Sequence, residues 1–287
     1  MSERVGYIGL GDMGKAMASR LVPAGFATIV FDLDERPVRE LVAGGATAAT
    51  SPREIGERAD IVCICVRTDE QLRRLLDGPE GLLAGIRPGA LVAIHSTVLP
   101  NTVHETAAAL GTCDVRVVDA SVTGGSYSAA TSELVFLVGG ADADVERVRP
   151  VLEASAATIL HAGPLGSGVK VKIAINALTA VMFAAATEAY QLASASGIDT
   201  EIFLAAGRAN GQLSDMQQRL LWTYELPHEV LHGEEFQSRQ RVQLLNAEKD
   251  LAHALALARE CEITMPTTAL VSQLTARIYQ IDDASRR

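Results

Sequence analysis

Three glycines near the amino terminus have the spacing that phosphate-binding loops use. The pattern G-x-G-x-x-G is fitted by six consecutive residues: Gly9, Leu10, Gly11, Asp12, Met13 and Gly14. The loop directly follows an apolar run and opens a helical stretch, and this context gives the pattern its weight. The first glycine permits a tight turn, the second lets the backbone approach a pyrophosphate, and the third lets the helix pack on the strand. The helix N-terminus favours the negative charge. The sequence therefore predicts a dinucleotide site at this loop.

An acidic residue follows the second apolar run at a distance that suits a ribose. Asp32 comes directly after residues 28–31, 18 positions beyond Gly14. A carboxylate here accepts hydrogen bonds from the adenosine ribose hydroxyls and repels a 2′-phosphate. The sequence therefore favours NAD as the cofactor and makes NADP the less favoured alternative.

A second motif with possible chemistry lies in the last third of the chain. The segment His228-Glu229-Val230-Leu231-His232 fits H-E-x-x-H, which on a helix presents two histidines to zinc. Pro227 and Gly233 bracket the segment so closely that only a turn or two of helix fits between them, and no third ligand follows at metalloprotease spacing. We therefore expect no metal site, and the role of the segment stays open.

Composition and charge exclude several classes of protein. The 287 residues carry a formal charge of −10, which offers no basic surface to nucleic acid, and 48% of them are hydrophobic, as in a globular protein. The four cysteines are too few and too scattered for a disulfide framework. The start lacks the features of a secretory signal, and the apolar stretch 173–186 is shorter than the roughly 18 to 20 residues that span a bilayer. These observations predict a cytoplasmic protein without membrane contact.

The elements that position the glycine loop repeat one unit through the first half of the chain. Near-continuous apolar runs, which are typical of buried parallel strands, alternate with helical stretches. The strands are expected at 5–8, 28–31, 61–66, 91–94, 116–119 and 134–138, with 158–160 as a candidate last strand. The helices are expected at 15–21, 37–43, 52–57, 69–76 and 100–110. This alternation predicts a doubly wound parallel sheet of Rossmann type over residues 1–163.

The pattern changes after the Gly-Pro-Leu-Gly-Ser-Gly run at 163–168. Helical segments follow, at 169–196, 200–207, 242–260 and 267–279. The fold class is therefore α/β, with an all-α domain at 164–287 that binds substrate and a second subunit. The helix from 169 is apolar around most of its circumference, so it must be buried in its own domain or against another subunit. We expect a homodimer or homotetramer.

Several ordered motifs together resemble the β-hydroxyacid dehydrogenase family, which includes 3-hydroxyisobutyrate dehydrogenase. The resemblance covers nearly the whole chain. It rests on the glycine loop, His95-Ser96-Thr97-Val98-Leu99-Pro100, the run from Asp119 to Gly125, the run from Gly166 to Asn176, and Lys249-Asp250-Leu251. The resemblance implies a Rossmann domain followed by a domain like the C-terminal one of 6-phosphogluconate dehydrogenase.

The resemblance also implies the catalytic residues. In the family, a lysine on the helix between the domains is catalytic, and an asparagine one turn later lies beside the substrate. Lys172 and Asn176 match these positions, and their spacing places both on one helix face, whereas Lys170 points elsewhere. An ammonium directed at the substrate oxygen can donate a proton as hydride reaches a carbonyl, or accept one from a hydroxyl. Asn176 would hold the lysine or the substrate by hydrogen bonds.

Other matched positions are implied to hold substrate and cofactor. Thr123, Gly124 and Gly125 match a Ser-Gly-Gly loop that holds the substrate carboxylate. Val66 stands where the family lines the cofactor cleft, and Thr97 matches a contact near the nicotinamide, beside a structural Ser96. Lys249 matches a lysine that reaches toward the cofactor, and Asp250 is expected to orient its helix or the neighbours of that helix.

The chain departs from the family pattern at a few positions. The family usually has Pro at Ser121, Gly-Thr at Ser132-Glu133, and Pro at Arg67, and the first family asparagine is replaced by Ile175. These changes leave the substrate open, together with the roles of His95, Arg67 and Glu133.

The function implied is reversible hydride transfer between NAD and a short-chain β-hydroxy acid such as 3-hydroxyisobutyrate, with Lys172 as general acid and base. The substrate is then a small carboxylate that meets the nicotinamide between the two domains. The alternatives are an imine reductase on the same scaffold and a cofactor-binding regulator without turnover. Retention of Lys172 with Asn176 argues against both.

Overall fold

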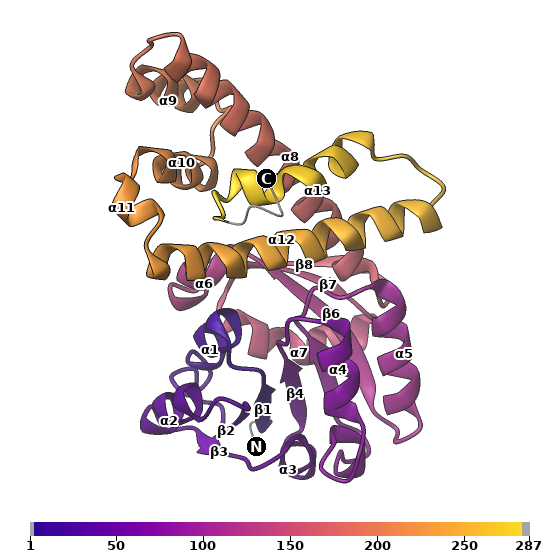
Figure 1. Ribbon diagram of the computed structural model, residues 1–287. Coiled ribbons are helices and arrows are strands. Elements are labelled where there is room, and N and C mark those ends of the chain that lie inside the picture. The colour runs from indigo at the N-terminus through magenta and orange to yellow at the C-terminus, as the bar shows by residue number, and fades with distance from the viewer. Residues whose placement is uncertain (1–2, 283–287) are drawn as a thin grey trace. The chain divides into compact units, whose positions relative to one another are not determined.

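The computed structural model describes residues 3–282, with the exception of the side chains of Ser126, Tyr127 and Ala130. The chain forms two compact units, of which the first ends at Lys172 and the second begins at Ile173. Helix α8 (Ser167–Ala195) begins in the first unit and continues in the second (Figure 1). The predicted domain boundary after residue 163 falls at the end of the last strand and stays a prediction.

An eight-stranded sheet forms the centre of the first unit, in the order β3-β2-β1-β4-β5-β6-β7-β8. The strands are β1 (Val5–Ile8), β2 (Thr28–Phe31), β3 (Thr47–Ala48), β4 (Ile61–Ile64), β5 (Leu91–Ile94), β6 (Arg116–Thr123), β7 (Leu134–Gly139) and β8 (Ala156–Gly163). Every residue of β1, β4 and β5 is buried, as expected for strands covered on both faces. The predicted Rossmann-type sheet is confirmed.

One pair of neighbouring strands departs from the parallel arrangement. β6 and β7 pair antiparallel, with Asp119 opposite Gly139 and Thr123 opposite Val135, whereas β7 and β8 are again parallel. A parallel crossover needs a dozen or more residues. The short stretch between Thr123 and Leu134, which holds only α6 (Gly125–Ala130), favours the antiparallel turn.

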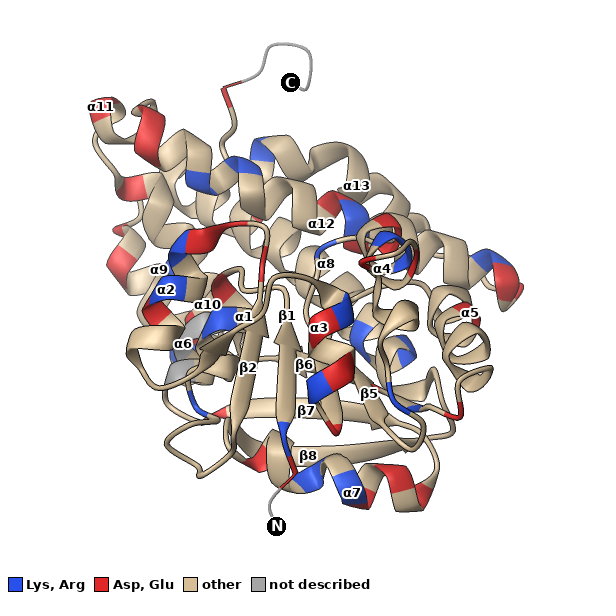
Figure 2. Cartoon of the chain, turned by 90° about the horizontal axis from the view of Figure 1, so that it is seen from below, with Lys and Arg blue, Asp and Glu red and all other residues tan. Residues whose placement is uncertain are grey.

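Helices cover both faces of this sheet. Their bounds are α1 (Asp12–Ala18), α2 (Glu35–Ala43), α3 (Pro52–Arg58), α4 (Asp69–Leu76), the 3₁₀ turn η1 (Leu82–Ala84), α5 (Pro100–Gly111) and α7 (Asp142–Glu153). Right-handed crossovers and the strand order place α1 and α2 on one face and α3, α4 and α5 on the other. Charged residues lie along outer helices such as α3 and α7 (Figure 2). The order reverses beside β1, where this fold binds dinucleotides.

The second unit is helical, as predicted. Besides most of α8 it contains α9 (Thr200–Ala209), α10 (Asp215–Trp222), the 3₁₀ turn η2 (Thr223–Glu225), α11 (His228–Leu231), α12 (Glu234–Glu260) and α13 (Pro266–Ile278). Phe183 of α8, Leu251 of α12 and Val271 of α13 belong to one buried hydrophobic cluster. A second cluster joins Tyr190 of α8 to Leu221 of α10.

Helix α8 keeps an apolar face exposed. Val171, Ile175, Leu178 and Met182 recur at helical spacing and are 37%, 37%, 58% and 37% exposed. We call these four residues the α8 stripe. The helix is longer than the stretch considered in the sequence, and it is long and apolar enough, by length and composition alone, to cross a membrane. One third of its most apolar window is buried inside the protein.

Candidate active site

The glycine loop between β1 and α1 needs two of its glycines for steric reasons. Gly9 has φ +90°, and a Cβ added there would lie 2.3 Å from the carbonyl oxygen of Cys65. A Cβ on Gly14 would lie 2.0 Å from the carbonyl oxygen of Gly9. No atom lies within 4 Å of a Cβ on Gly11, so the backbone at this exposed position is open to a ligand. The three environments fit the roles of turn, phosphate approach and helix packing.

Asp32 connects the glycine loop to the end of β2. Its Oδ2 accepts a hydrogen bond from the Leu10 N–H at 2.5 Å, and its Oδ1 accepts one from the Asp34 N–H at 2.8 Å. Each carboxylate oxygen has a second lone pair for a ribose hydroxyl. Asp12 and Met13 form the first turn of α1, with Asp12 exposed. The residues present therefore fit the adenosine end of NAD.

The ends of β4 and β5 are joined beside the glycine loop. The Val66 N–H donates to Ser96 Oγ at 2.8 Å, which gives Ser96 the structural role expected of it. Thr97 follows and is partly buried. Arg67 is exposed, and its backbone N–H donates to Gln71 at 2.8 Å. The described part of the chain gives the Arg67 guanidinium no role.

His95 lies inside the first unit and does not face a site. It is 4% exposed, its Nδ1 lies 2.8 Å from the Ala120 carbonyl oxygen, and its ring stacks on Tyr7 with 5.9 Å between centroids. Burial lowers the pKa of His95 to about 4. The ring is therefore neutral near pH 7 and acts in packing.

The loop after β6 contains two successive glycines with left-handed backbone conformations. Thr123 is partly buried at the end of the strand, and Gly124 and Gly125 have φ values of +129° and +80°. Two successive left-handed residues turn backbone amides in a way that suits an anion. The loop closes through Glu133, whose N–H donates to the Ser128 carbonyl oxygen at 2.7 Å and whose carboxylate accepts from Thr131. This is the structural role of Glu133.

Asp119, which was not among the predicted site residues, is a buried carboxylate on β6. Its Oδ1 accepts from the Gly166 N–H at 2.6 Å, and its Oδ2 accepts from the Val169 N–H at 2.7 Å. Burial raises the pKa of Asp119, against the two backbone hydrogen bonds, which lower it. The motif run 119–125 contained this residue, but its partners lie about fifty positions away, beyond the reach of local pattern.

Lys172 and Asn176 are both partly buried and stand one turn apart on α8. Asn176 Nδ2 donates to Asp250 Oδ2 at 2.7 Å, and Lys249 Nζ lies 2.9 Å from Asp250 Oδ1. Asp250 therefore uses one oxygen for each partner. The hydrogen bond fixes the Asn176 amide so that its carbonyl oxygen points away from Asp250. The spacing of Lys172 and Asn176 along the sequence placed them on one helix face, but it could not predict this contact between α8 and α12.

The two histidines of the H-E-x-x-H segment lie side by side, with 4.1 Å between their ring centroids, but the helix at this segment is short. α11 spans only His228–Leu231, and His232 Nδ1 is bonded to Asp282 Oδ2. Among residues 3–282, no group of three or more His, Cys, Asp or Glu side chains could hold a metal ion. Through His232, which directly follows α11, the segment instead contacts Asp282 in the chain after α13.

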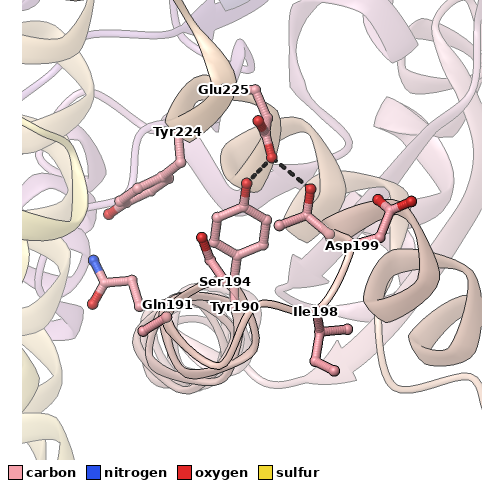
Figure 3. Close-up of a pocket in the computed structure, with 9 residues that line it drawn as sticks. Tyr190, Gln191, Ser194, Ile198, Asp199, Tyr224 and Glu225 are labelled. Atoms are coloured by element: carbon pink, nitrogen blue, oxygen red, sulfur yellow. Dashed lines mark hydrogen bonds between the residues drawn. The ribbon is translucent and has the colours of Figure 1, made fainter.

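A pocket of about 560 Å³ in the second unit contains none of the predicted site residues (Figure 3). It is lined by α8, the start of α9 and η2. Glu225 is one of the lining residues and accepts hydrogen bonds from the Tyr190 hydroxyl and from Thr200 Oγ1. Burial and the Glu225 carboxylate raise the pKa of Tyr190 to about 12. Tyr190 and Thr200 therefore both donate to the same carboxylate oxygen of Glu225.

Two family matches divide the chain between them. Residues 4–163 match the NAD binding domain of 6-phosphogluconate dehydrogenase, and residues 166–285 match the NAD-binding domain of NADP-dependent 3-hydroxyisobutyrate dehydrogenase. The second match includes the whole of α8. The helix that composition alone would allow to span a membrane thus lies within a region that matches a domain of an oxidoreductase.

Similar proteins are known from bacteria. A 3-hydroxyisobutyrate dehydrogenase of Pseudomonas aeruginosa is 32% identical over 282 residues, which are 97% of this chain and 93% of that protein. An NAD-dependent L-serine dehydrogenase of the same organism is 38% identical over 70% of this chain and 67% of its own length. An uncharacterized oxidoreductase of Mycobacterium tuberculosis is 41% identical over 68% of this chain and 66% of that protein.

Solved structures agree with the family matches. A 3-hydroxyisobutyrate dehydrogenase of Mycobacterium tuberculosis, solved with L-serine, superposes with a TM-score of 0.79 at 28% identity and covers 96% of this chain and 94% of that chain. An imine reductase from Pseudomonas sp. shares the fold with a TM-score of 0.67 at 19% identity, over 100% of this chain and 98% of that chain. Together with the family matches and the glycine loop, these likenesses show that the chain belongs to the β-hydroxyacid dehydrogenase family of NAD-binding oxidoreductases.

Proposed function

We propose that this oxidoreductase transfers hydride reversibly between NAD and a short-chain β-hydroxy acid of the 3-hydroxyisobutyrate type. The observation that carries the proposal is the pair Lys172 and Asn176 on one face of α8, with the Asn176 amide held by Asp250. The 3-hydroxyisobutyrate dehydrogenase that aligns over nearly the whole chain supports the substrate class. The proposal comprises an NAD-binding domain at 1–163 and a helical domain at 164–287, in a cytoplasmic enzyme.

Lys172 is the general acid and base of the proposed reaction. Bound NAD supplies the nicotinamide that accepts hydride from the carbon bearing the hydroxyl, or returns it. In oxidation the neutral Lys172 amine takes the hydroxyl proton, and in reduction the ammonium donates a proton to the carbonyl oxygen. Asn176 holds the substrate hydroxyl within reach of Lys172, since its own orientation is fixed by Asp250.

The proposed substrate carboxylate binds at Thr123, Gly124 and Gly125. The two left-handed glycines support this assignment, because they let neighbouring amides converge on an anion. Val66, Thr97 and Lys249 complete the proposed cofactor contacts. Asp32 makes the enzyme prefer NAD, since a second negative charge beside its carboxylate would be repelled.

The experiment that tests the proposal measures turnover of small 3-hydroxy acids with NAD and with NADP. Lys172→Ala should lower kcat at least about 10²-fold, in line with the loss of a general acid–base group. Lys170→Ala is the matched control, because Lys170 is exposed on the same turn of α8 but not on the same face, and it should keep wild-type kcat. Equal rates for wild type and Lys172→Ala contradict the lysine mechanism, and a higher kcat/KM with NADP contradicts the role of Asp32.

L-serine is a second candidate substrate. It is itself a 3-hydroxy acid, and both the L-serine dehydrogenase relative and the structure solved with L-serine favour it. A higher kcat/KM for L-serine than for 3-hydroxyisobutyrate would select it. Turnover of cyclic imines instead of hydroxy acids would select the imine reductase alternative, and NAD binding without any turnover would select a regulator.

We also propose that the enzyme is a homodimer or homotetramer in which the α8 stripe contacts a second copy. The stripe supports this because its four large apolar side chains are exposed along one face of α8. A second subunit would cover them.

A further inference from the structure

Asp119 caps a helix that lies far from it in sequence. The residue is 1% exposed on β6, and both of its carboxylate oxygens accept backbone N–H groups, from Gly166 at 2.6 Å and from Val169 at 2.7 Å. These amides lie at the start of α8, where helices have N–H groups without partners in the helix itself. A carboxylate at this position satisfies them and is favoured by the helix dipole.

The first turn of α8 fits closely around this carboxylate. A Cβ on Gly168 would lie 2.2 Å from the Leu137 carbonyl oxygen and 2.9 Å from Asp119 Oδ2. A Cβ on Gly139 would lie 2.4 Å from Asp119 Oδ1, and Val169 is completely buried. The start of α8 therefore cannot slide or rotate without breaking the two hydrogen bonds or colliding with β7.

The same residue connects two parts of the proposed site. Thr123 follows Asp119 by four residues on β6, and Lys172 follows Val169 by three residues, about one turn of α8. We propose that Asp119 is a positioning residue, which sets the place of Lys172 relative to the carboxylate loop by fixing the first turn of α8. This inference rests on the proposed function.

The variant Asp119→Asn tests the inference. It keeps the side-chain volume but turns an NH₂ group toward a backbone N–H, so one of the two hydrogen bonds is lost. We expect kcat for the best hydroxy acid to fall about 10- to 10²-fold, because small misplacements of a catalytic group are costly. The Kd of NAD, measured by fluorescence titration, should change less than about twofold. Amide exchange at Gly166 and Val169 should become at least about tenfold faster.

Asp60→Asn is the matched control. Asp60 is also a hydrogen-bonded carboxylate of the first unit, but it precedes β4 and binds Arg4 and Arg87 at the opposite end of the strands. This variant should lower Tm and leave both kcat and the exchange at Gly166 and Val169 unchanged. A loss of stability alone would therefore not reproduce the result expected for Asp119→Asn.

The outcomes separate the inference from the proposed function. Wild-type kcat in Asp119→Asn, or unchanged exchange at Gly166 and Val169, overturns the positioning role. If Asp119→Asn does not fold, Gly168→Ala decides, because its added methyl group pushes the first turn of α8 away from the Asp119 carboxylate. This variant should lower kcat without changing the Kd of NAD, and an unaltered kcat overturns the inference. A wild-type enzyme without turnover on any hydroxy acid overturns the proposed function instead, whatever the exchange data show.

Discussion

His95 is a neutral imidazole in the interior of the first unit, and this makes stability depend on pH. Its pKa is about 4 in the folded protein, below the 6.5 of an exposed histidine, because burial penalises the charged ring. The unfolded chain therefore binds more protons between pH 6.5 and 4, and stability is lost as pH falls through this range. At 1.36 kcal/mol per pKa unit, the loss is about 3 kcal/mol.

The variant His95→Gln should remove that loss. Its free energy of unfolding, measured with urea at several pH values, should fall less between pH 6.5 and 4 than that of the wild type. His104→Gln, at an exposed position, is the control and should keep the wild-type slope. An identical slope for His95→Gln and wild type would show that the ring is charged or solvated in the folded protein.

Ser121 has a buried hydroxyl without a hydrogen-bond partner among the described residues. A buried unsatisfied polar group lowers the free energy of unfolding by about 1–3 kcal/mol, because it loses its hydration. A methyl group at the same place has no such desolvation penalty. Ser121→Ala should therefore raise the free energy of unfolding by about 1 kcal/mol in urea titrations. A decrease of that size would mean that the hydroxyl is hydrogen-bonded in solution.

At the scale of the elements, the contact between α8 and α12 gives a prediction about the Asn176 amide. Asp250→Ala removes the acceptor of the Asn176 hydrogen bond as well as the partner of Lys249. Asp250→Asn keeps an acceptor for Asn176 and loses only the charge. Steady-state kinetics should show kcat lowered about tenfold or more by Asp250→Ala, with most of kcat retained by Asp250→Asn.

The KM for NAD separates the two partners of Asp250. Both variants lose the ion pair with Lys249, so their KM values for NAD should change alike. Glu260→Gln, at the exposed end of α12, is the control and should resemble the wild type. A similar drop of kcat in Asp250→Ala and Asp250→Asn would assign the effect to charge and not to the orientation of Asn176.

The elements that local pattern predicts are those with continuous apolar runs. β1, β2 and β5 have the bounds expected from the sequence, since their burial on both faces requires such runs. β3 was missed because it has only two residues, Thr47 and Ala48, and both are exposed. α7 was missed, and it contains Pro150, which the sequence pattern treats as a helix breaker.

A tertiary contact explains why α12 begins earlier than expected. α12 was expected from residue 242 but begins at Glu234, because Gln237 buries its amide by donating to the Leu231 and Gln280 carbonyl oxygens. A buried glutamine does not contribute to the apolar periodicity from which a helix is predicted, so the start of α12 could not be recognised in the sequence. The site shows the same limit: motifs predicted the positions of Lys172 and Asn176, but the contacts of Asp119 and Asp250 join segments that no local pattern connects.

At the scale of the whole molecule, the α8 stripe predicts self-association. Four large apolar side chains lie exposed along one face of a long helix, and covering them removes apolar surface from water. Each copy also carries a formal charge of −10, so two copies repel one another at long range. Added salt screens this repulsion, and the dimer should therefore become tighter, not weaker, as ionic strength rises.

Light scattering at micromolar concentration should show the wild type as a dimer or larger. Leu178→Asp places a charge in the centre of the stripe, where it must lose its hydration in the assembly, and should weaken association at least about 100-fold. Val42→Asp, at a 41% exposed position of α2, introduces the same charge elsewhere and should leave the assembly intact. Because Leu178 is 58% exposed in a single chain, Leu178→Asp should still fold, so a monomeric product reports on the interface. A monomeric wild type, or a Leu178→Asp variant that associates as tightly as the wild type, would place the contact between copies on another surface.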